Sequence, residues 1–286
     1  MYVAQDIFVI KGNGDREKFS EEKILRTIRR VGVPVNLQEQ AVSHIKDSLY
    51  QDIPTSEVYS HLSEFLNEEN LEVPALKLNL KKAIFDLGPT GFPFEKYVGK
   101  IFESKGYAVE VGTTLDGNCV THEIDVLIEK DGKRFAVEAK FHNQPGTRTD
   151  IQVALYTHAR YLDIKEKNNI SNVWIFTNTK LTRDAVDYCR CKGIHAVGWN
   201  YPGEENLQDS VERPNLYPIT ILTTLPAHTK HRMVENGIVL VTDLLETPKD
   251  MLEDKFLLQK NDIEKARSEA RKLCGITGSI EKDISQ

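Results

Sequence analysis

The stretch HEIDVLIEKDGKRFAVEAK, residues 122–140, contains two strand patterns joined by an Asp-Gly pair. The first strand pattern carries one acid, Asp125, among apolar neighbours, and the second ends in Glu138 and Lys140 with one residue between them. An Asp-Gly pair between two such runs is typical of a two-residue β-hairpin. We therefore expect Asp125 to lie in a buried strand, across a hairpin from Glu138 and Lys140.

The spacing of Glu138 and Lys140 places both side chains on one face of a strand, because side chains alternate between faces. Spacing alone favours an ordinary solvated strand face, whereas the buried Asp125 in the neighbouring strand favours a functional site. Two carboxylates can hold Mg²⁺ or Mn²⁺ through oxygen ligands, and a lysine can orient a water or stabilise charge on a phosphate. The three residues together favour hydrolysis of phosphodiester bonds.

The segments around the hairpin alternate between helix and strand patterns. The periodicity predicts helices over 94–105, from 150 and from 182, and strands over 107–111, 123–129, 134–141, 173–177 and 195–199. This order predicts an α/β domain with a mixed central sheet.

The chain over about 91–199 resembles the PD-(D/E)XK nuclease superfamily, in particular its Mrr-like restriction endonuclease branch. The matching segments are FEKYVGKIFESKGY, HEIDVLIE, FAVEAK and DIQVALYTHARYL. The resemblance implies a restriction-endonuclease-like core, Mg²⁺ or Mn²⁺ on Asp125 and Glu138, and DNA as substrate. It implies these catalytic residues: Glu95, Asp125, Glu138, Lys140 and Gln152.

Two members of this set have ordinary alternatives. Glu95 could be a surface acid of its helix, and Gln152, three residues after Thr149, could serve only in a capping box at a helix start. His122 and His142 flank the hairpin, and we expect them to be polar edge residues rather than ligands, because Mg²⁺ favours oxygen.

The N-terminal segment, over about 5–88, resembles an ATP-cone, a small regulatory nucleotide-binding domain. The matching segments are VIKGNGDREKFSEEKILRTI, residues 9–28, and DIPTSEVYSHLSEFL, residues 52–66. The resemblance implies that ATP or dATP binds here as a regulatory ligand. It implies these nucleotide contacts: Val9, Ile10, Lys11, Lys23 and Thr55. The family commonly has a basic pair where this chain has Lys11-Gly12, and this departure implies weaker or altered phosphate binding.

The C-terminal segment resembles a helix-hairpin-helix module, from MVENGIVLVTDLLETPKDML, residues 233–252, to NDIEKARSEARKL, residues 261–273. Such hairpins offer backbone N–H groups to a DNA phosphate. A helical packing module or an oligomerisation surface is the alternative.

The formal net charge of −6 argues against a protein that binds nucleic acid by bulk electrostatics alone, although a local basic groove can coexist with it. The four cysteines lack paired metal-ligand spacing and are expected to be free thiols. No apolar run is long enough to cross a bilayer, so we expect a cytoplasmic protein without a membrane partner.

These patterns predict a nucleotide-binding domain over 1–89, a nuclease domain over 90–200, a linker over 201–218 and a helical domain over 219–286. The predicted activity is a divalent-metal-dependent endonuclease acting on DNA, regulated by an adenine nucleotide, in restriction, defence or repair. A homo-oligomer is expected. The alternatives are a nuclease specific for junctions or branched DNA, and an inactive nucleotide-dependent DNA-binding or assembly protein. DNA rather than RNA, the cleavage specificity and the identity of the nucleotide stay open.

Overall fold

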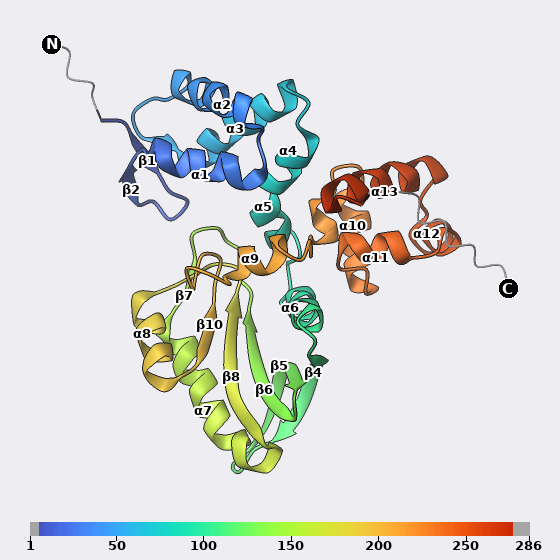
Figure 1. The fold of residues 1–286 in the computed structure, drawn as a ribbon. Coiled ribbons are helices and arrows are strands. Elements are labelled where there is room, and N and C mark those ends of the chain that lie inside the picture. The colour runs from blue at the N-terminus through green and yellow to red at the C-terminus, as the bar shows by residue number, and fades with distance from the viewer. Residues whose placement is uncertain (1–5, 277–286) are drawn as a thin grey trace.

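Five strands form the central sheet of the computed structural model, which describes residues 6–276 (Figure 1). Their order across the sheet is β10-β8-β6-β5-β4. The β4–β5 and β5–β6 pairs are antiparallel, whereas β6–β8 and β8–β10 are parallel. The strands are β4 (Ala108–Asp116), β5 (Thr121–Lys130), β6 (Lys133–Lys140), β8 (Ile170–Thr177) and β10 (His195–Val197). The mixed sheet expected of an α/β core is confirmed.

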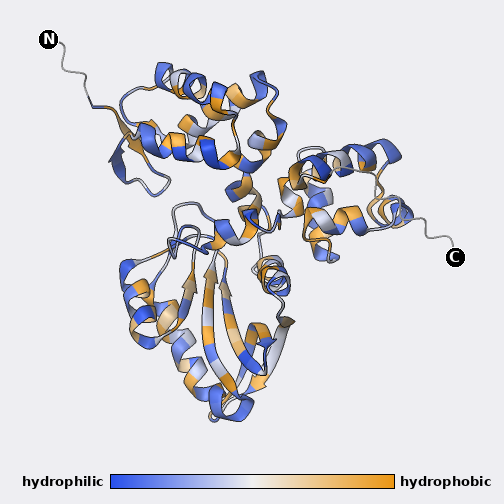
Figure 2. Cartoon of the chain, viewed as in Figure 1, coloured by the Kyte–Doolittle hydropathy of each residue, from blue (hydrophilic) through white to orange (hydrophobic). Residues whose placement is uncertain are grey.

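Helices cover both faces of this sheet. They are α6 (Phe92–Ser104), α7 (Ile151–Asn168) and α8 (Arg183–Lys192). α6 shares one apolar core with Val126 and Val137, while α7 and α8 share another core with Leu127 and Ile175. Figure 2 shows apolar segments along the strands between these helices. Gly99 allows α6 to approach β4 closely, since a Cβ at this position would lie 3.2 Å from the Val109 and Val111 side chains.

The hairpin between β5 and β6 turns at the expected Asp-Gly pair. Asp131 and Gly132 have φ angles of 52° and 71°, the left-handed conformations that a tight hairpin turn requires. β5 extends beyond the predicted strand by two residues at its start and one at its end, whereas β6 has the predicted length and begins and ends one residue earlier. A second sheet, which the sequence did not indicate, pairs β7 (Arg148–Thr149) in parallel with β9 (Lys180–Leu181) beside the ends of β6 and β8.

The N-terminal module combines a three-stranded sheet, in the order β2-β1-β3, with helices. Its elements are β1 (Phe8–Ile10), β2 (Arg16–Lys18), α1 (Glu21–Val31), α2 (Val35–Asp47), β3 (Ile53–Pro54), α3 (Thr55–Glu68), α4 (Glu72–Leu78) and α5 (Leu80–Phe85). Ser20 caps α1, with its side chain accepting from the Lys23 N–H. The chain breaks at Asn79, so α4 and α5 are two separate helices.

The segment after the sheet is packed against the rest of the molecule. Its elements are α9 (Leu207–Glu212), the 3-10 helix η1 (Ile219–Ile221), α10 (Ala227–Glu235), α11 (Val241–Glu246), α12 (Lys249–Phe256) and α13 (Lys260–Cys274). The prediction of a linker over 201–218 is wrong as a description of its structure. Leu207 and Val211 are fully buried on α9, and Tyr217 is buried in the same apolar core.

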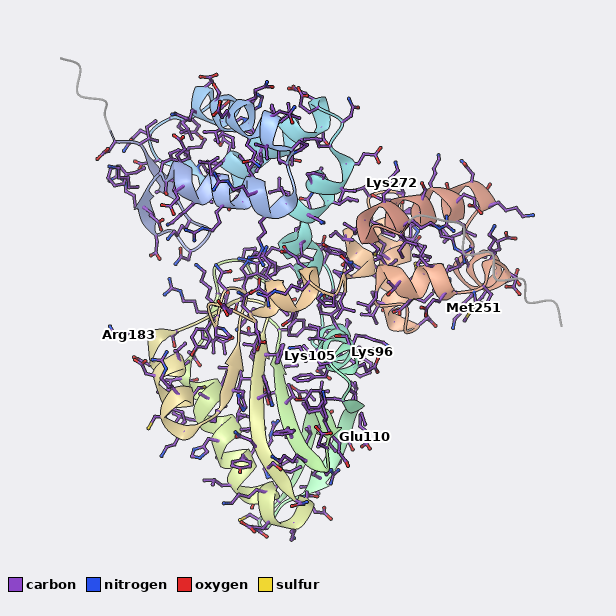
Figure 3. All side chains as sticks on the ribbon, in the orientation of Figure 1. Lys96, Lys105, Glu110, Arg183, Met251 and Lys272 are labelled. Carbon is purple, nitrogen blue, oxygen red and sulfur yellow. The ribbon has the colours of Figure 1, made fainter. Side chains whose placement is uncertain are left out.

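The modules also meet through polar contacts. Arg30 of α1 donates to Asp209 at 2.5 Å and to Glu212 at 2.7 Å on α9. Lys272 of α13, labelled in Figure 3, contacts Glu72 of α4. No helix within residues 6–276 combines the length and apolar character that spanning a membrane requires. The ends of the predicted first and last domains, at residues 1 and 286, lie outside the described residues.

Candidate functional site

Asp125 lies where the hydrogen-bonded ladder between β5 and β6 ends. The last ladder pair at this end is Val126 with Val137. Beyond it, Asp125 Oδ2 accepts a hydrogen bond of 2.7 Å from the Ala139 backbone N–H. The carboxylate thus satisfies an amide that the next ladder pair would otherwise use, and this bond fixes the position of Asp125 beside β6.

Glu138 and Lys140 leave β6 on the face opposite to Val137 and Ala139. Val137 and Ala139 are buried in the core that includes α6, whereas the side chains of Glu138 and Lys140 are partly exposed. The strand alternation predicted for this motif is therefore present. It brings both polar side chains to the face that α7 covers, where Asp125 also lies within electrostatic reach of Glu138.

Arg160 of α7 belongs to this site, and the sequence reasoning missed it. Its Nη1 donates to Glu138 Oε2 at 2.7 Å, and the two side chains are only 12% and 14% exposed. The guanidinium lies over the Tyr156 ring, 4.4 Å from its centroid, and also contacts the Tyr156 hydroxyl. A spacing of four residues separates Gln152, Tyr156 and Arg160. This spacing alone predicts that the three side chains lie on one face of a helix.

Burial and crowding of carboxylates shape the electrostatics. Burial raises the pKa of Glu138, and the negative charge of Asp125 adds to the rise, while Arg160 and Lys140 act in the opposite direction. Burial also raises the pKa of Asp125, whereas its hydrogen bond from Ala139 and the charge of Arg160 lower it. The cationic neighbours therefore offset part of the cost of holding two acids in a buried site.

Glu95, near the start of α6, lies within the field of the same acids. Burial is the main cause that raises its pKa to about 7, followed by the charges of Asp125, Glu123 and Glu138. Its surroundings therefore differ from those of the exposed surface acid considered as an alternative. Glu123, an exposed residue of β5, is a further acid of this group that the sequence reasoning did not single out.

Gln152 is exposed in the first turn of α7. The helix is capped by Asp150, whose side chain accepts from the Gln152 N–H at 3.0 Å. The capping box between Thr149 and Gln152 is therefore wrong. Thr149 lies in β7, and its hydroxyl donates to Thr177 Oγ1 at 2.8 Å.

The two histidines beside the site have polar partners from the protein. His122 Nε2 lies 2.8 Å from Asp163 Oδ2, and this contact is the main cause that holds the pKa of Asp163 well below its usual range. His142 Nε2 lies 2.9 Å from Thr149 Oγ1. Burial, followed by the charge of Lys140, lowers the pKa of His142. Both histidines therefore have polar partners within the protein, and their role as edge residues rather than ligands stays a prediction.

Asp125 and Glu138 are the residues best placed to hold a divalent cation. No group of three or more His, Cys, Asp or Glu side chains within residues 6–276 is arranged as a complete metal site. Mg²⁺ needs no such group, because it keeps several waters and takes one or two carboxylates together with phosphate oxygens. The hydrogen bonds from Ala139 and Arg160 each engage one carboxylate oxygen, so the donor set fits a hard cation bound through the other oxygens.

The N-terminal module brings most of the predicted nucleotide contacts together. Ile10 of β1 pairs with β3, and the Thr55 hydroxyl donates to the Ile10 carbonyl at 2.9 Å. The amino groups of Lys11 and Lys23 both contact the Glu17 carboxylate. Val9 differs, because its side chain is buried in the core of the module and leaves only its backbone for a ligand.

The turn predicted to offer amides to DNA in the C-terminal segment is occupied by the protein. The Val239 and Leu240 N–H groups both donate to Asp243 Oδ2 at 2.8 Å. The Ile238 N–H donates to the Met233 carbonyl, and all of residues 238–241 are buried. These contacts favour the packing alternative for this turn.

The chain is similar to known protein families, to one archaeal protein and to one solved structure. A model described as restriction endonuclease, Mrr_cat, matches residues 89–198, and one described as AF1548-like, C-terminal, matches residues 217–274. An uncharacterized protein of Archaeoglobus fulgidus is 38% identical over 181 residues, which are 62% of this chain and 100% of the archaeal protein. A crystal structure described as protein of unknown function AF1548 matches with a TM-score of 0.57 and 34% identity, over 66% of this chain and 100% of that chain.

The chain belongs to the AF1548-like family. Its restriction endonuclease domain indicates an endonuclease and implies DNA as the substrate. All the sequence-predicted catalytic residues, and Arg160, lie within that domain. The N-terminal module of this AF1548-like protein precedes both matched ranges, so its likeness to an ATP-cone stays a prediction.

Proposed function

We propose that this AF1548-like protein is a divalent-metal-dependent endodeoxyribonuclease. In this proposal Asp125 and Glu138 hold Mg²⁺ or Mn²⁺, and Lys140 acts beside them. One observation carries the proposal: Asp125 and Glu138 meet at the end of the β5–β6 ladder, with Lys140 on the Glu138 face, inside a restriction endonuclease domain. We place the enzyme in restriction, defence or repair of DNA.

Each side chain has a distinct task in this mechanism. The cation, when bound, neutralises phosphate charge and lowers the pKa of a coordinated water. The Ala139 N–H and the Arg160 guanidinium hold the Asp125 and Glu138 carboxylates in place. Lys140, on the same face as Glu138, orients the attacking water or stabilises the negative charge that develops on the phosphate.

Glu95 and Gln152 have supporting roles in the proposal. With a pKa raised to about 7, the Glu95 carboxyl can take up and release a proton near neutral pH, which suits a group that contacts the attacking water. Gln152 stands two turns before Arg160 on the same face of α7, where its amide can contact the substrate. Arg160 acts through Glu138 and is a positioning residue.

The N-terminal module supplies regulation in this proposal. The segment has no Gly-x-x-x-x-Gly-Lys-Ser/Thr motif, so an adenine nucleotide would regulate rather than drive the reaction. The proximity of Ile10, Lys11 and Thr55, with Lys23 on the shared Glu17 carboxylate, supports a nucleotide site there. ATP or dATP is the proposed ligand.

Incubation with nucleic acids tests the proposal. Purified protein is mixed with supercoiled, linear or branched DNA, or with RNA, in Mg²⁺ or Mn²⁺, with and without ATP or dATP. We expect cleavage of DNA that requires the cation, and a loss of cleavage of about a hundredfold or more in Glu138→Gln. Preference for branched DNA would identify a structure-specific nuclease instead. Absence of cleavage on all substrates would favour an inactive DNA-binding protein.

A further inference from the structure

Basic side chains from two modules gather beside the catalytic domain. Arg148 of β7 and Lys180 of β9 are direct neighbours in the small parallel sheet. Lys11 follows β1 of the N-terminal module, and its charge acts on Lys180 together with that of Arg148. We call Lys11, Arg148 and Lys180 the junction cluster. It contains one residue predicted to bind a nucleotide and two residues from the nuclease domain.

The backbones of the two modules touch at this cluster. Gly146, with φ of 90°, packs so closely against the N-terminal turn that a Cβ there would lie 2.9 Å from the Gly12 carbonyl and the Asn13 nitrogen. Arg148 Nη2 also donates to Asp15 Oδ2 of that turn at 3.3 Å. The turn that follows Lys11 is therefore held against the loop that leads into β7.

Positive charge is concentrated at this contact. Burial lowers the pKa of Lys180, and the charges of Lys11 and Arg148 lower it further. The pKa of Lys81 is lowered by burial and then by the charge of Lys180. Two acids in this region, Asp15 and Glu17, contact members of the cluster, but the basic groups outnumber them. In a chain with a net charge of −6, such a patch attracts a multiply charged anion.

We propose that the junction cluster binds the phosphate chain of a nucleoside triphosphate held by the N-terminal module, so that Arg148 and Lys180 of the nuclease domain complete the site. Lys11 links the cluster to Ile10 and Thr55, where the rest of the nucleotide is proposed to bind. Arginine and lysine donors suit phosphate oxygens. This inference rests on the nucleotide regulation proposed above.

The position of β7 gives this site a route to the catalytic residues. Arg148 is followed by Thr149, which contacts His142 and Thr177, and then by Asp150, which caps α7. About three turns further along α7, Arg160 holds Glu138. A phosphate chain that pulls on Arg148 acts directly on the start of this helix. Bound nucleotide should therefore change the rate of DNA cleavage through α7, which is a coupling that requires a direct test.

Calorimetric titration of the full-length protein with ATP tests the shared site. The test variants are Arg148→Ala, Lys180→Ala and the double variant, and the matched control is Lys192→Ala, an exposed lysine at the far end of α8. We expect the double variant to weaken ATP binding about tenfold or more, whereas the control keeps the wild-type Kd. An unfolding temperature equal to that of the wild-type protein shows that the variants are folded.

The same titrations separate the two proposals. If the wild-type protein binds neither ATP nor dATP, nucleotide regulation itself fails. If Lys11→Ala and Lys23→Ala weaken binding but Arg148→Ala and Lys180→Ala do not, regulation stands and the shared site is overturned. Loss of DNA binding by the double variant, with ATP binding intact, would show instead that the cluster holds DNA phosphates. A double variant saturated with ATP should also cleave DNA at its nucleotide-free rate, and a retained response would overturn the coupling.

Discussion

The two modules that flank the nuclease domain are attached in different ways. The helices α1, α2 and α3 of the N-terminal module enclose a core of their own, which meets α9 and β7 through ion pairs and close loop contacts. The last two helices of this module, α4 and α5, already contribute buried residues to the core that α6 shares. The C-terminal helices share one continuous apolar core with α6 and the central sheet. An apolar core shared by two modules couples their folding, whereas exposed polar contacts can break and reform at little cost. The attachment of the N-terminal module suits the regulatory role proposed for it, and the attachment of the C-terminal helices suits structural support of the nuclease domain.

The largest difference in stability should appear when the C-terminal and the N-terminal module are deleted in turn. Deletion of residues 216–286 uncovers the core that contains α6 and removes the Leu216 carbonyl to which the buried Tyr97 hydroxyl donates at 2.8 Å. We expect this protein to be insoluble or unfolded, whereas deletion of residues 1–70 leaves a folded nuclease domain. Circular dichroism and thermal unfolding measure both. A cooperatively folded protein without residues 216–286 would contradict the shared core and revive a separable DNA-binding tail.

A cavity in either core should lower the free energy of unfolding by a similar amount, but the two cavities should affect different unfolding transitions. Ile219 of η1 and Ile45 of α2 are both fully buried, one in the shared core and one in the N-terminal core. Each change to Ala should lower the free energy of unfolding by about 2–5 kcal/mol. Calorimetry should show that Ile219→Ala lowers the unfolding temperature of the catalytic part, with loss of cleavage on heating. Ile45→Ala should lower only a separate N-terminal transition, and a single transition for both variants would refute two cores.

The ion pairs between α1 and α9 should contribute less. Arg30 donates to both Asp209 and Glu212, but its side chain is one third exposed and solvent screens the pairs. We expect Arg30→Ala to lower stability by about 1 kcal/mol or less, measured by urea unfolding. Arg26→Ala, which removes a more exposed pair within α1, is the control. A loss several times larger than this would mean that the N-terminal module folds together with the nuclease domain.

The pH dependence of stability should distinguish the same two parts. Because folding raises the pKa of Glu95 from 4.5 to about 7, its stabilising contribution is present below pH 4.5 and is lost as the pH rises through about 7. Without divalent cations, Glu95→Gln should therefore raise the unfolding temperature of the catalytic part at about pH 8, by about 1–3 °C, and not at about pH 5. The N-terminal transition should not change. An equal effect at both pH values would show that burial and the neighbouring acids do not raise the pKa of Glu95 on folding.

The sequence predicted the elements whose signals are local. Alternation along β6 placed Glu138 and Lys140 on one face, and the Asp-Gly pair predicted the hairpin between β5 and β6. The contacts that depend on the path of the whole chain were not predictable in this way. The ion pair between Arg160 and Glu138 joins residues 22 positions apart on a helix and a strand. The polar appearance of residues 201–218 hid the apolar face of α9, because a helix of six residues gives too short a pattern.

The stretch that resembles a helix-hairpin-helix module contains a turn at Gly237, with φ of 90°. Sequence could not show that Asp243 accepts the Val239 and Leu240 amides, since any early acid in α11 could also face solvent. The turn is present in the structure, but the backbone amides that would contact a DNA phosphate already donate to Asp243.

The most direct measurement for the account as a whole is cleavage of DNA by the pair Asp125→Asn and Glu110→Gln. Asparagine keeps an oxygen that can accept the Ala139 N–H but lacks the charge that a cation requires, while Glu110 is an exposed acid of β4 (Figure 3). With Mg²⁺ or Mn²⁺, Asp125→Asn should lose cleavage by about a hundredfold or more, with unchanged folding and DNA binding, and Glu110→Gln should cut at the wild-type rate. A folded Asp125→Asn protein that cleaves DNA as fast as wild type would contradict the assignment of this site.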